Sequence, residues 1–171
     1  MSEKKRIVIV NEEDEIIGFK ERGTLIPERD IYRVSALWIR NSRGDILLAQ
    51  RAFTKSHNPG EWGSAVAGTV DEGETYEENI IKEAEEEIGL FGYEFEKAMK
   101  TRSPGTPHNY FTQWFTFSID EPVEFFTIQE EEVADLRWFG EKELREALAR
   151  HPEKFLPSLP KYLELFSEDR R

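Results

Sequence analysis

The glycines and glutamates of the stretch Gly68–Leu90 constrain this chain more than any other feature of its sequence. The stretch reads GTVDEGETYEENIIKEAEEEIGL, in which Glu83, Glu86 and Glu87 stand at positions i, i+3 and i+4. On an α-helix these side chains share one face within a single turn, where like charges destabilise the helix by about 0.2–0.5 kcal/mol per pair. A bound divalent cation would remove that repulsion, so the spacing predicts a metal site.

The flanking residues decide between a metal site and an ordinary solvated acidic helix face. Four apolar residues form the stripe of a core-facing helix, namely Ile80, Ile81, Ala84 and Ile88. Thr75 with Glu78 three residues later is typical of a capping box, and Gly89 occupies the position of a left-handed C-terminal cap. A helix with a buried face and two defined ends favours the metal site.

Length, charge and cysteine content exclude several classes of protein. At 171 residues the chain is long enough for one domain with its own core and short for two. A net charge of -12 disfavours binding to nucleic acid polymers or membrane surfaces, because that affinity comes from clustered lysine and arginine. Without cysteine there is no thiolate metal site and no cysteine nucleophile. The charged N-terminus and the lack of a long apolar run predict a cytoplasmic protein.

Hydrophobic periodicity predicts an α/β fold. Runs rich in β-forming residues indicate strands at 6–10, 16–19, 32–40, 46–51, 65–70, 95–100, 110–119, 124–128 and 136–139. Helical patterns follow at 141–150 and, beyond a break marked by Pro157 and Pro160, at 160–166. This order of strands, helix, strands and helices predicts an α/β sandwich.

The pattern of the stretch resembles the Nudix box, a motif of spaced glycines and glutamates around a basic residue. The matching residues are Gly68, Glu74, Lys82, Glu83, Ala84, Glu86, Glu87, Gly89 and Leu90. Two of them depart from the family pattern, since Lys82 replaces an arginine and Ala84 is smaller than the usual aliphatic residue. The resemblance implies a Nudix-like α/β/α sandwich with a mixed β-sheet and a loop-helix-loop catalytic motif. It also implies a single domain over residues 1–171, with an N-terminal β-hairpin extension at 1–30, the box at 68–90, and a C-terminal helix and tail at 152–171.

A finer likeness is to the isopentenyl-diphosphate-isomerase-like branch of that family, through residues 11–18 and 40–62. Isomerases of this fold use a catalytic cysteine on the strand that follows a tryptophan. Here the tryptophan is Trp62 and the cysteine position is Ala67, and alanine has no proton to transfer. We therefore expect a hydrolase rather than an isomerase.

For a Nudix hydrolase the resemblance implies metal-assisted attack of water on a phosphorus atom of a diphosphate. All-oxygen ligands favour Mg²⁺, with Mn²⁺ as the alternative cation. The expected ligands are Glu83, Glu86, Glu87 and the backbone carbonyl of Ala67. Glu74 and Lys82 are expected to lock the loop against the helix next to Gly68, although lysine keeps the charge of arginine without its bidentate fork.

The general base and the substrate contacts are less narrowly defined. The base is open between Glu86 or Glu87 in the box and two later residues, Glu131 and Glu132. Two basic residues, Arg51 and Lys55, match those that grip the diphosphate in the isomerase-like branch.

The expected substrate is a small-molecule diphosphate, with nucleotides as the favoured class. Several aromatic residues offer faces on which a base could stack, although most are expected in the core: Tyr32, Phe53, Trp62, Tyr110, Phe111 and Trp114. The alternative is a catalytically silent Nudix-fold module that binds a nucleotide or a partner, because Lys82 departs from the family pattern and the box does not specify a substrate. A homodimer is left open.

Overall fold

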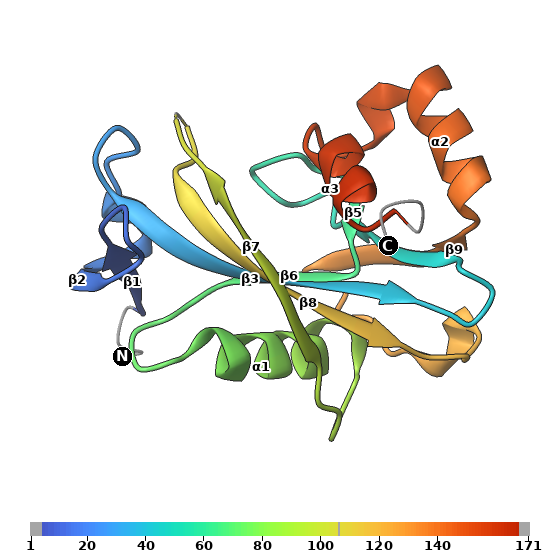
Figure 1. Ribbon diagram of the computed structural model, residues 1–171, viewed down its shortest axis with the longest axis horizontal. Helices are drawn as coiled ribbons and strands as arrows, with labels where there is room; N and C mark the ends of the chain where they lie inside the picture. The colour runs from blue at the N-terminus through green and yellow to red at the C-terminus, as the bar shows by residue number, and fades with distance from the viewer. Residues whose placement is uncertain (1–4, 106, 168–171) are drawn as a thin grey trace. The chain divides into compact units, whose positions relative to one another are not determined.

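The computed structural model describes residues 5–105 and 107–167 of the chain. Contacts divide the chain into two compact units. The first comprises the chain up to Leu37 with Val66–Glu85 and Phe91–Phe117, and the second comprises Trp38–Ala65, Glu86–Leu90 and the chain from Ser118 onward. Strands and helices follow one another along the chain in Figure 1, so the predicted α/β architecture is confirmed.

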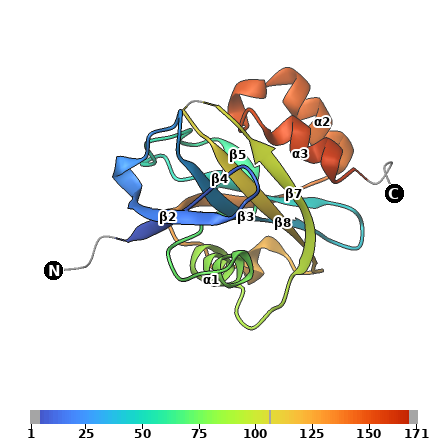
Figure 2. The same cartoon turned by 60° about the vertical axis from the view of Figure 1, so that its left-hand side comes forward.

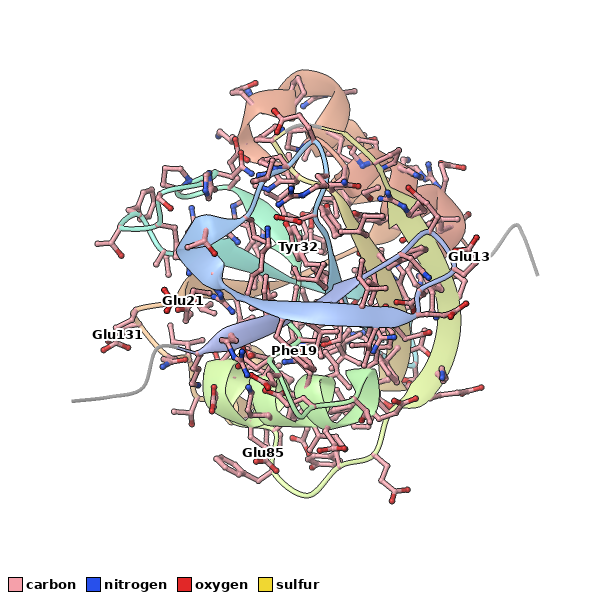
Figure 3. All side chains as sticks on the ribbon, turned by 90° about the vertical axis from the view of Figure 1, so that its left-hand side faces the viewer. Glu13, Phe19, Glu21, Tyr32, Glu85 and Glu131 are labelled. Carbon is pink, nitrogen blue, oxygen red and sulfur yellow. The ribbon has the colours of Figure 1, made fainter. Side chains whose placement is uncertain are left out.

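The first unit is built on β-strands that pair in a mixed, parallel and antiparallel arrangement. They are β1 (Arg6–Val10), β2 (Ile16–Glu21), the first part of β3 (Ile31–Arg40), β6 (Val66–Thr69), β7 (Glu96–Ser103) and β8 (Tyr110–Ser118). β1 and β2 form the expected N-terminal hairpin, followed by a short 3-10 helix at Arg22–Thr24. β8 pairs with both β3 and β7, and residues 111–115 are buried on both faces, as expected for a central strand. Figure 3 shows Phe19 and Glu21 along β2.

The turn of the N-terminal hairpin is tied to the rest of the first unit through Asp14. Its carboxylate accepts hydrogen bonds from Arg33 Nε at 2.7 Å, from the Tyr76 hydroxyl at 2.9 Å and from Lys100 Nζ at 2.6 Å. Burial alone would raise the pKa of Asp14, but the bonds from Lys100, Arg33 and Tyr76 outweigh burial and lower it. This carboxylate therefore stabilises the fold in its charged form.

The helix of the box is α1 (Tyr76–Ile88), which lies against one face of the strands in Figure 1 and Figure 2. Its start is capped as predicted, because the amide of Glu78 donates to Thr75 Oγ1 at 3.1 Å. Its end is closed as predicted by Gly89, whose φ is +72°. The buried stripe differs at one position, since Ile81 is 37% exposed whereas Asn79 is fully buried.

The second unit is organised around β4 (Ile46–Arg51). This strand pairs with the end of β3, with β5 (Trp62–Ser64) and with β9 (Val133–Phe139). Two helices follow, α2 (Glu141–Arg150) and α3 (Leu159–Leu165), with a 3-10 turn at Pro152–Lys154 between them. Their buried leucines, Leu144, Leu159 and Leu163, add to the core of this unit. In the part of the chain that the structure describes, no helix has the length and apolar character needed to cross a bilayer.

The strand predicted at residues 124–128 is absent. Val123–Phe125 forms a 3-10 helix after Pro122. The amides of Thr127 and Gln129 then donate to backbone carbonyls at the end of α1 instead of to a neighbouring strand. Tertiary hydrogen bonds thus override the local β-preference of this run.

The strand expected at residues 65–70 is present as β6, and a separate strand that was not predicted, β5, precedes it. The backbone bends at Ala65, so that β5 pairs with β4 whereas β6 pairs with β3. The last helix begins at Leu159, one residue earlier than predicted, with Pro160 in its first turn where proline is tolerated. Residues 168–171 of the expected C-terminal tail lie outside the described residues.

Candidate active site

The side chain of Glu83 packs directly on the backbone of Gly68 in the first unit. A Cβ atom at position 68 would lie 2.4 Å from Cγ and 2.6 Å from Cδ of Glu83, so only glycine leaves room for this carboxylate. The Glu83 side chain is 17% exposed. Gly68 follows Ala67 on β6, and Ala67 is exposed. The motif glycine is therefore explained by its contact with a candidate metal ligand.

The expected pairing of Glu74 with Lys82 is present, and a third residue joins it. Lys82 Nζ lies 2.6 Å from Glu74 Oε1, 3.2 Å from Asp71 Oδ2 and 3.8 Å from Glu83 Oε1. Burial pushes the pKa of Lys82 down, but hydrogen bonds to Glu74 and Asp71 outweigh burial and raise it. An ammonium group has three protons that can point to three separate carboxylates, whereas the guanidinium fork of arginine suits one carboxylate bidentately. Lys82 is thus matched to its surroundings, and Asp71 is a member of the cluster that the sequence analysis missed.

Asn79 is a second residue that the sequence analysis missed. Its Nδ2 donates to the carbonyl of Thr69 at 3.1 Å and to Glu74 Oε2 at 3.0 Å. Its Oδ1 accepts a hydrogen bond from the hydroxyl of Ser35 on β3. A polar residue immediately before the buried Ile80 is the signal that could have revealed it. Asn79 ties β3, the box loop and α1 together, which fixes the position of Glu74.

The three candidate metal ligands stand on one unbroken helix, because α1 runs from Tyr76 to Ile88. Glu83 belongs to the first unit, and Glu86 and Glu87 belong to the second. Among residues 5–105 and 107–167, no three Asp, Glu or His side chains already stand close enough together to hold a metal ion. Mg²⁺ prefers carboxylate oxygens and keeps several water molecules, so a few protein ligands suffice. The chemistry of this donor set fits a divalent cation.

In the second unit, the end of α1 is bonded to the segment that carries the other acidic candidates. The amide of Gln129 donates to the carbonyl of Glu87 at 2.9 Å. The chain then turns, and the amide of Glu132 donates back to the carbonyl of Gln129 at 2.9 Å. We call residues 129–132 the acidic turn. These bonds anchor the acidic turn to the last turn of the box helix.

Two predicted site residues with different expected roles are paired with each other. Lys55 Nζ lies 2.6 Å from Glu132 Oε2, and their side chains are 29% and 39% exposed. The amide of Ala52 donates to the carbonyl of Glu132 at 3.0 Å, which joins the two segments through the backbone as well. Glu131 is exposed and projects outward from the acidic turn in Figure 3. Glu132, and not Glu131, is brought next to a basic candidate.

Arg51, at the end of β4, is held by hydrogen bonds to the loop that connects β4 with β5. Its Nε donates to the carbonyl of His57 at 3.0 Å, its amide donates to the carbonyl of Glu61 at 2.9 Å, and its carbonyl accepts from Gly60 at 3.0 Å. Within the described residues, the two terminal guanidinium nitrogens of Arg51 have no hydrogen-bond partner. They remain available to phosphate oxygens, for which a guanidinium is well suited.

The aromatic candidates separate into core and surface. Trp114 and Phe111 are 1% and 8% exposed, so they belong to the core, as expected for most of the set. The rings of Tyr32 and Tyr110 are 5.3 Å apart in the first unit and are only half-buried. Phe53, in the second unit, is 69% exposed.

Comparison with known proteins finds one family model and several relatives that match this chain. The family model of the NUDIX domain matches residues 31–159. An isopentenyl-diphosphate Delta-isomerase of Enterobacter sp. (strain 638) is 26% identical over 165 residues, which cover 92% of this chain and 88% of that protein. An uncharacterised Nudix hydrolase of Listeria monocytogenes is 29% identical over 160 residues, which cover 87% of this chain and 86% of that protein. The crystal structure of DR0079 from Deinococcus radiodurans has a TM-score of 0.81 at 26% identity and covers 95% of this chain and 99% of that one.

Proposed function

This chain belongs to the Nudix family, whose hydrolases act on pyrophosphate bonds, and we propose that it hydrolyses the diphosphate linkage of a nucleoside di- or triphosphate or of another nucleoside-diphosphate-linked compound. The proposed cofactor is Mg²⁺, and Mn²⁺ would suit the same oxygen donors. One observation supports the proposal: in the box, Glu83 packs on Gly68, and Lys82 is bonded to Glu74 and Asp71. A module that only binds nucleotides has no evident need for this arrangement.

Each part of the site has a distinct task in this proposal. The residues that would hold the cation are Glu83, Glu86, Glu87 and the backbone carbonyl of Ala67. When bound, the cation neutralises charge on the phosphate oxygens and activates water. Lys82 and Glu74 keep the loop in place, and Arg51 presents its free guanidinium edge to the phosphate oxygens.

The general base is proposed to be Glu132. The bond from the Gln129 amide to the Glu87 carbonyl holds the backbone of the acidic turn at the end of the box helix. Glu131 points outward from the same turn. The two box carboxylates that were also considered, Glu86 and Glu87, are needed as ligands.

Isomerase activity is not proposed, despite the 26% identity with an isopentenyl-diphosphate isomerase. The chain contains no cysteine, and alanine stands at position 67, where the isomerases carry the thiol that transfers a proton. The silent-module alternative rested mainly on Lys82. It loses that support because Lys82 forms hydrogen bonds with two carboxylates of the box loop.

The test is a panel of nucleotides and nucleotide conjugates incubated with and without Mg²⁺, with release of phosphate and pyrophosphate followed. Isopentenyl diphosphate belongs in the panel as the isomerase control. We expect metal-dependent release from at least one nucleotide, with a loss of at least about 100-fold in Glu86→Gln and in Glu87→Gln. The proposal fails if no compound gives metal-dependent release, or if both variants retain the activity of the unmodified protein.

A further inference from the structure

The ion pair between Lys55 and Glu132 joins two residues with different expected tasks. A lysine that grips a diphosphate directs its ammonium group to phosphate oxygens, and a glutamate that takes a proton from water uses its carboxylate as the acceptor. In the structure the two groups are 2.6 Å apart, a charge-assisted hydrogen bond. An ammonium group has three protons, so Lys55 can contact a phosphate oxygen while it is still bonded to Glu132. Because Lys55 occupies the carboxylate that is to accept a proton, Glu132 is better able to act as base once Lys55 has turned to the phosphate.

The backbones of both residues are hydrogen-bonded, because the amide of Lys55 also donates to the carbonyl of Ala52 at 3.2 Å, so the reach of the two side chains indicates which partner moves. Glu132 is held on both sides, since its carbonyl accepts from Ala52 at 3.0 Å and its amide donates to Gln129 at 2.9 Å. Gln129 in turn is bonded to Glu87 at the end of α1. Lys55 reaches the pair with a flexible four-carbon stem, which can redirect its ammonium group without moving the backbone. Lys55 is therefore the partner that moves.

The exposure of the ion pair and the charge of a diphosphate indicate what draws Lys55 away from Glu132. With side chains 29% and 39% exposed, the pair can be reached by a solute. Ion pairs exposed to this degree are weak, and a diphosphate offers more negative charge than one carboxylate. Arg51, fixed four residues before Lys55 with free terminal nitrogens, would hold the same diphosphate close to the pair.

We propose that the Lys55–Glu132 pair is a latch opened by the diphosphate of the substrate. Lys55 exchanges the carboxylate of Glu132 for a phosphate oxygen, and Glu132 becomes free to act as base only when substrate is bound. The attacking water then forms its oxygen–phosphorus bond while one of its protons passes to Glu132 Oε2. The anhydride bond breaks with its electron pair on the departing phosphate oxygen. The latch refines the proposed function by adding substrate-dependent exposure of the base.

The test is a double-mutant cycle on the affinity for inorganic pyrophosphate, measured by calorimetry without added divalent cation. The proteins are the unmodified chain, Lys55→Met, Glu132→Gln and the double variant. Glu130→Gln is the control, because it removes the same charge from an exposed position of the same turn. Since Glu132 competes with pyrophosphate for Lys55, we expect Glu132→Gln to tighten binding by about twofold to fivefold relative to Glu130→Gln. Lys55→Met should weaken binding, and in the Lys55→Met background the gain from Glu132→Gln should disappear.

Three results would overturn the latch. They are no gain in Glu132→Gln beyond the control, a gain that persists without Lys55, and equal or undetectable pyrophosphate binding in all of the proteins. Because this measurement involves no turnover, it is independent of the hydrolase proposal. A chain that shows the predicted cycle but hydrolyses nothing would retain the exchange of Lys55 between Glu132 and a diphosphate, and would refute the hydrolase function on which the role of Glu132 as base rests.

Discussion

Replacing Gly68 with alanine tests whether the contact between Gly68 and Glu83 positions a metal ligand. The added Cβ would lie 2.4 Å from Cγ and 2.8 Å from Oε1 of Glu83. Favourable carbon–carbon contacts begin near about 3.5 Å, so the Glu83 side chain must move by about 1 Å. The φ of Gly68 is not in the left-handed region, so the backbone accepts alanine. The perturbation is thus confined to the carboxylate.

We expect Gly68→Ala to lower the free energy of unfolding slightly and the affinity for metal strongly. Overpacking costs about 1–3 kcal/mol, offset by about 0.5–1 kcal/mol because alanine replaces glycine within a strand. The net loss of about 0–2.5 kcal/mol lowers Tm by up to about 10 °C for a chain of this size and leaves the protein folded at 25 °C. Disturbing the support of a ligand typically weakens metal affinity by about 10- to 100-fold, and we expect a loss in this range.

The assay is a calorimetric titration with Mn²⁺ at 25 °C, with Tm measured on the same samples. Gly18→Ala on β2 is the matched control, because no atom lies within 4 Å of a Cβ placed there. We expect the control to bind Mn²⁺ with unchanged affinity. If Gly68→Ala stays folded and binds Mn²⁺ as tightly as the unmodified protein, Glu83 is not a ligand positioned by this glycine.

Three further outcomes are expected. Lys82→Arg should leave turnover equal or lower, because the guanidinium cannot reproduce the separate bonds to Glu74 and Asp71; a clear rise in turnover would contradict this interpretation. Asp14→Asn should lower the free energy of unfolding by about 1–3 kcal/mol at pH 7. Because the pKa of Asp14 is lowered in the folded state, this stabilisation is present above about pH 4 and is lost as the pH falls further, so urea unfolding should show the difference between the variant and the unmodified protein shrinking as the pH is lowered below about 4. Gly89→Ala should cost about 1–2 kcal/mol, since φ is +72° and the added Cβ would crowd Thr127 at 3.1 Å, and an unchanged Tm would argue against that strain.

Local signals made the box helix predictable. The caps at Thr75 and Gly89 and the spacing of the glutamates depend on residues within one or two turns, and the structure reproduces both ends. Ile81 was placed wrongly because a periodicity of 3.6 residues leaves positions at the edge of the stripe ambiguous. There, the bonds made by Asn79 decide which side of the helix is buried.

Features that depend on residues distant in sequence were not predictable. Residues 124–128 have a β-rich composition, but their conformation is set by bonds to the end of a helix formed much earlier in the chain. The pairing of Lys55 with Glu132 joins positions separated by 77 residues. Sequence patterns assigned each of these two residues a role without showing that they contact each other.

The residues that surround Lys82 determine which substitutions the box can accept during evolution. The ammonium group is 2.6 Å from Glu74 and 3.2 Å from Asp71, and the same two carboxylates keep its pKa raised. The effect of any substitution at one of these three positions is therefore conditional on the residues at the other two. An arginine introduced at position 82 alone would face carboxylates that are placed to bond a lysine. A neutral residue at position 71 would leave Lys82 with one hydrogen-bonded carboxylate fewer. Such epistasis predicts that positions 71, 74 and 82 change together. The lysine that departs from the family pattern at position 82 is therefore expected to persist as long as Asp71 and Glu74 do.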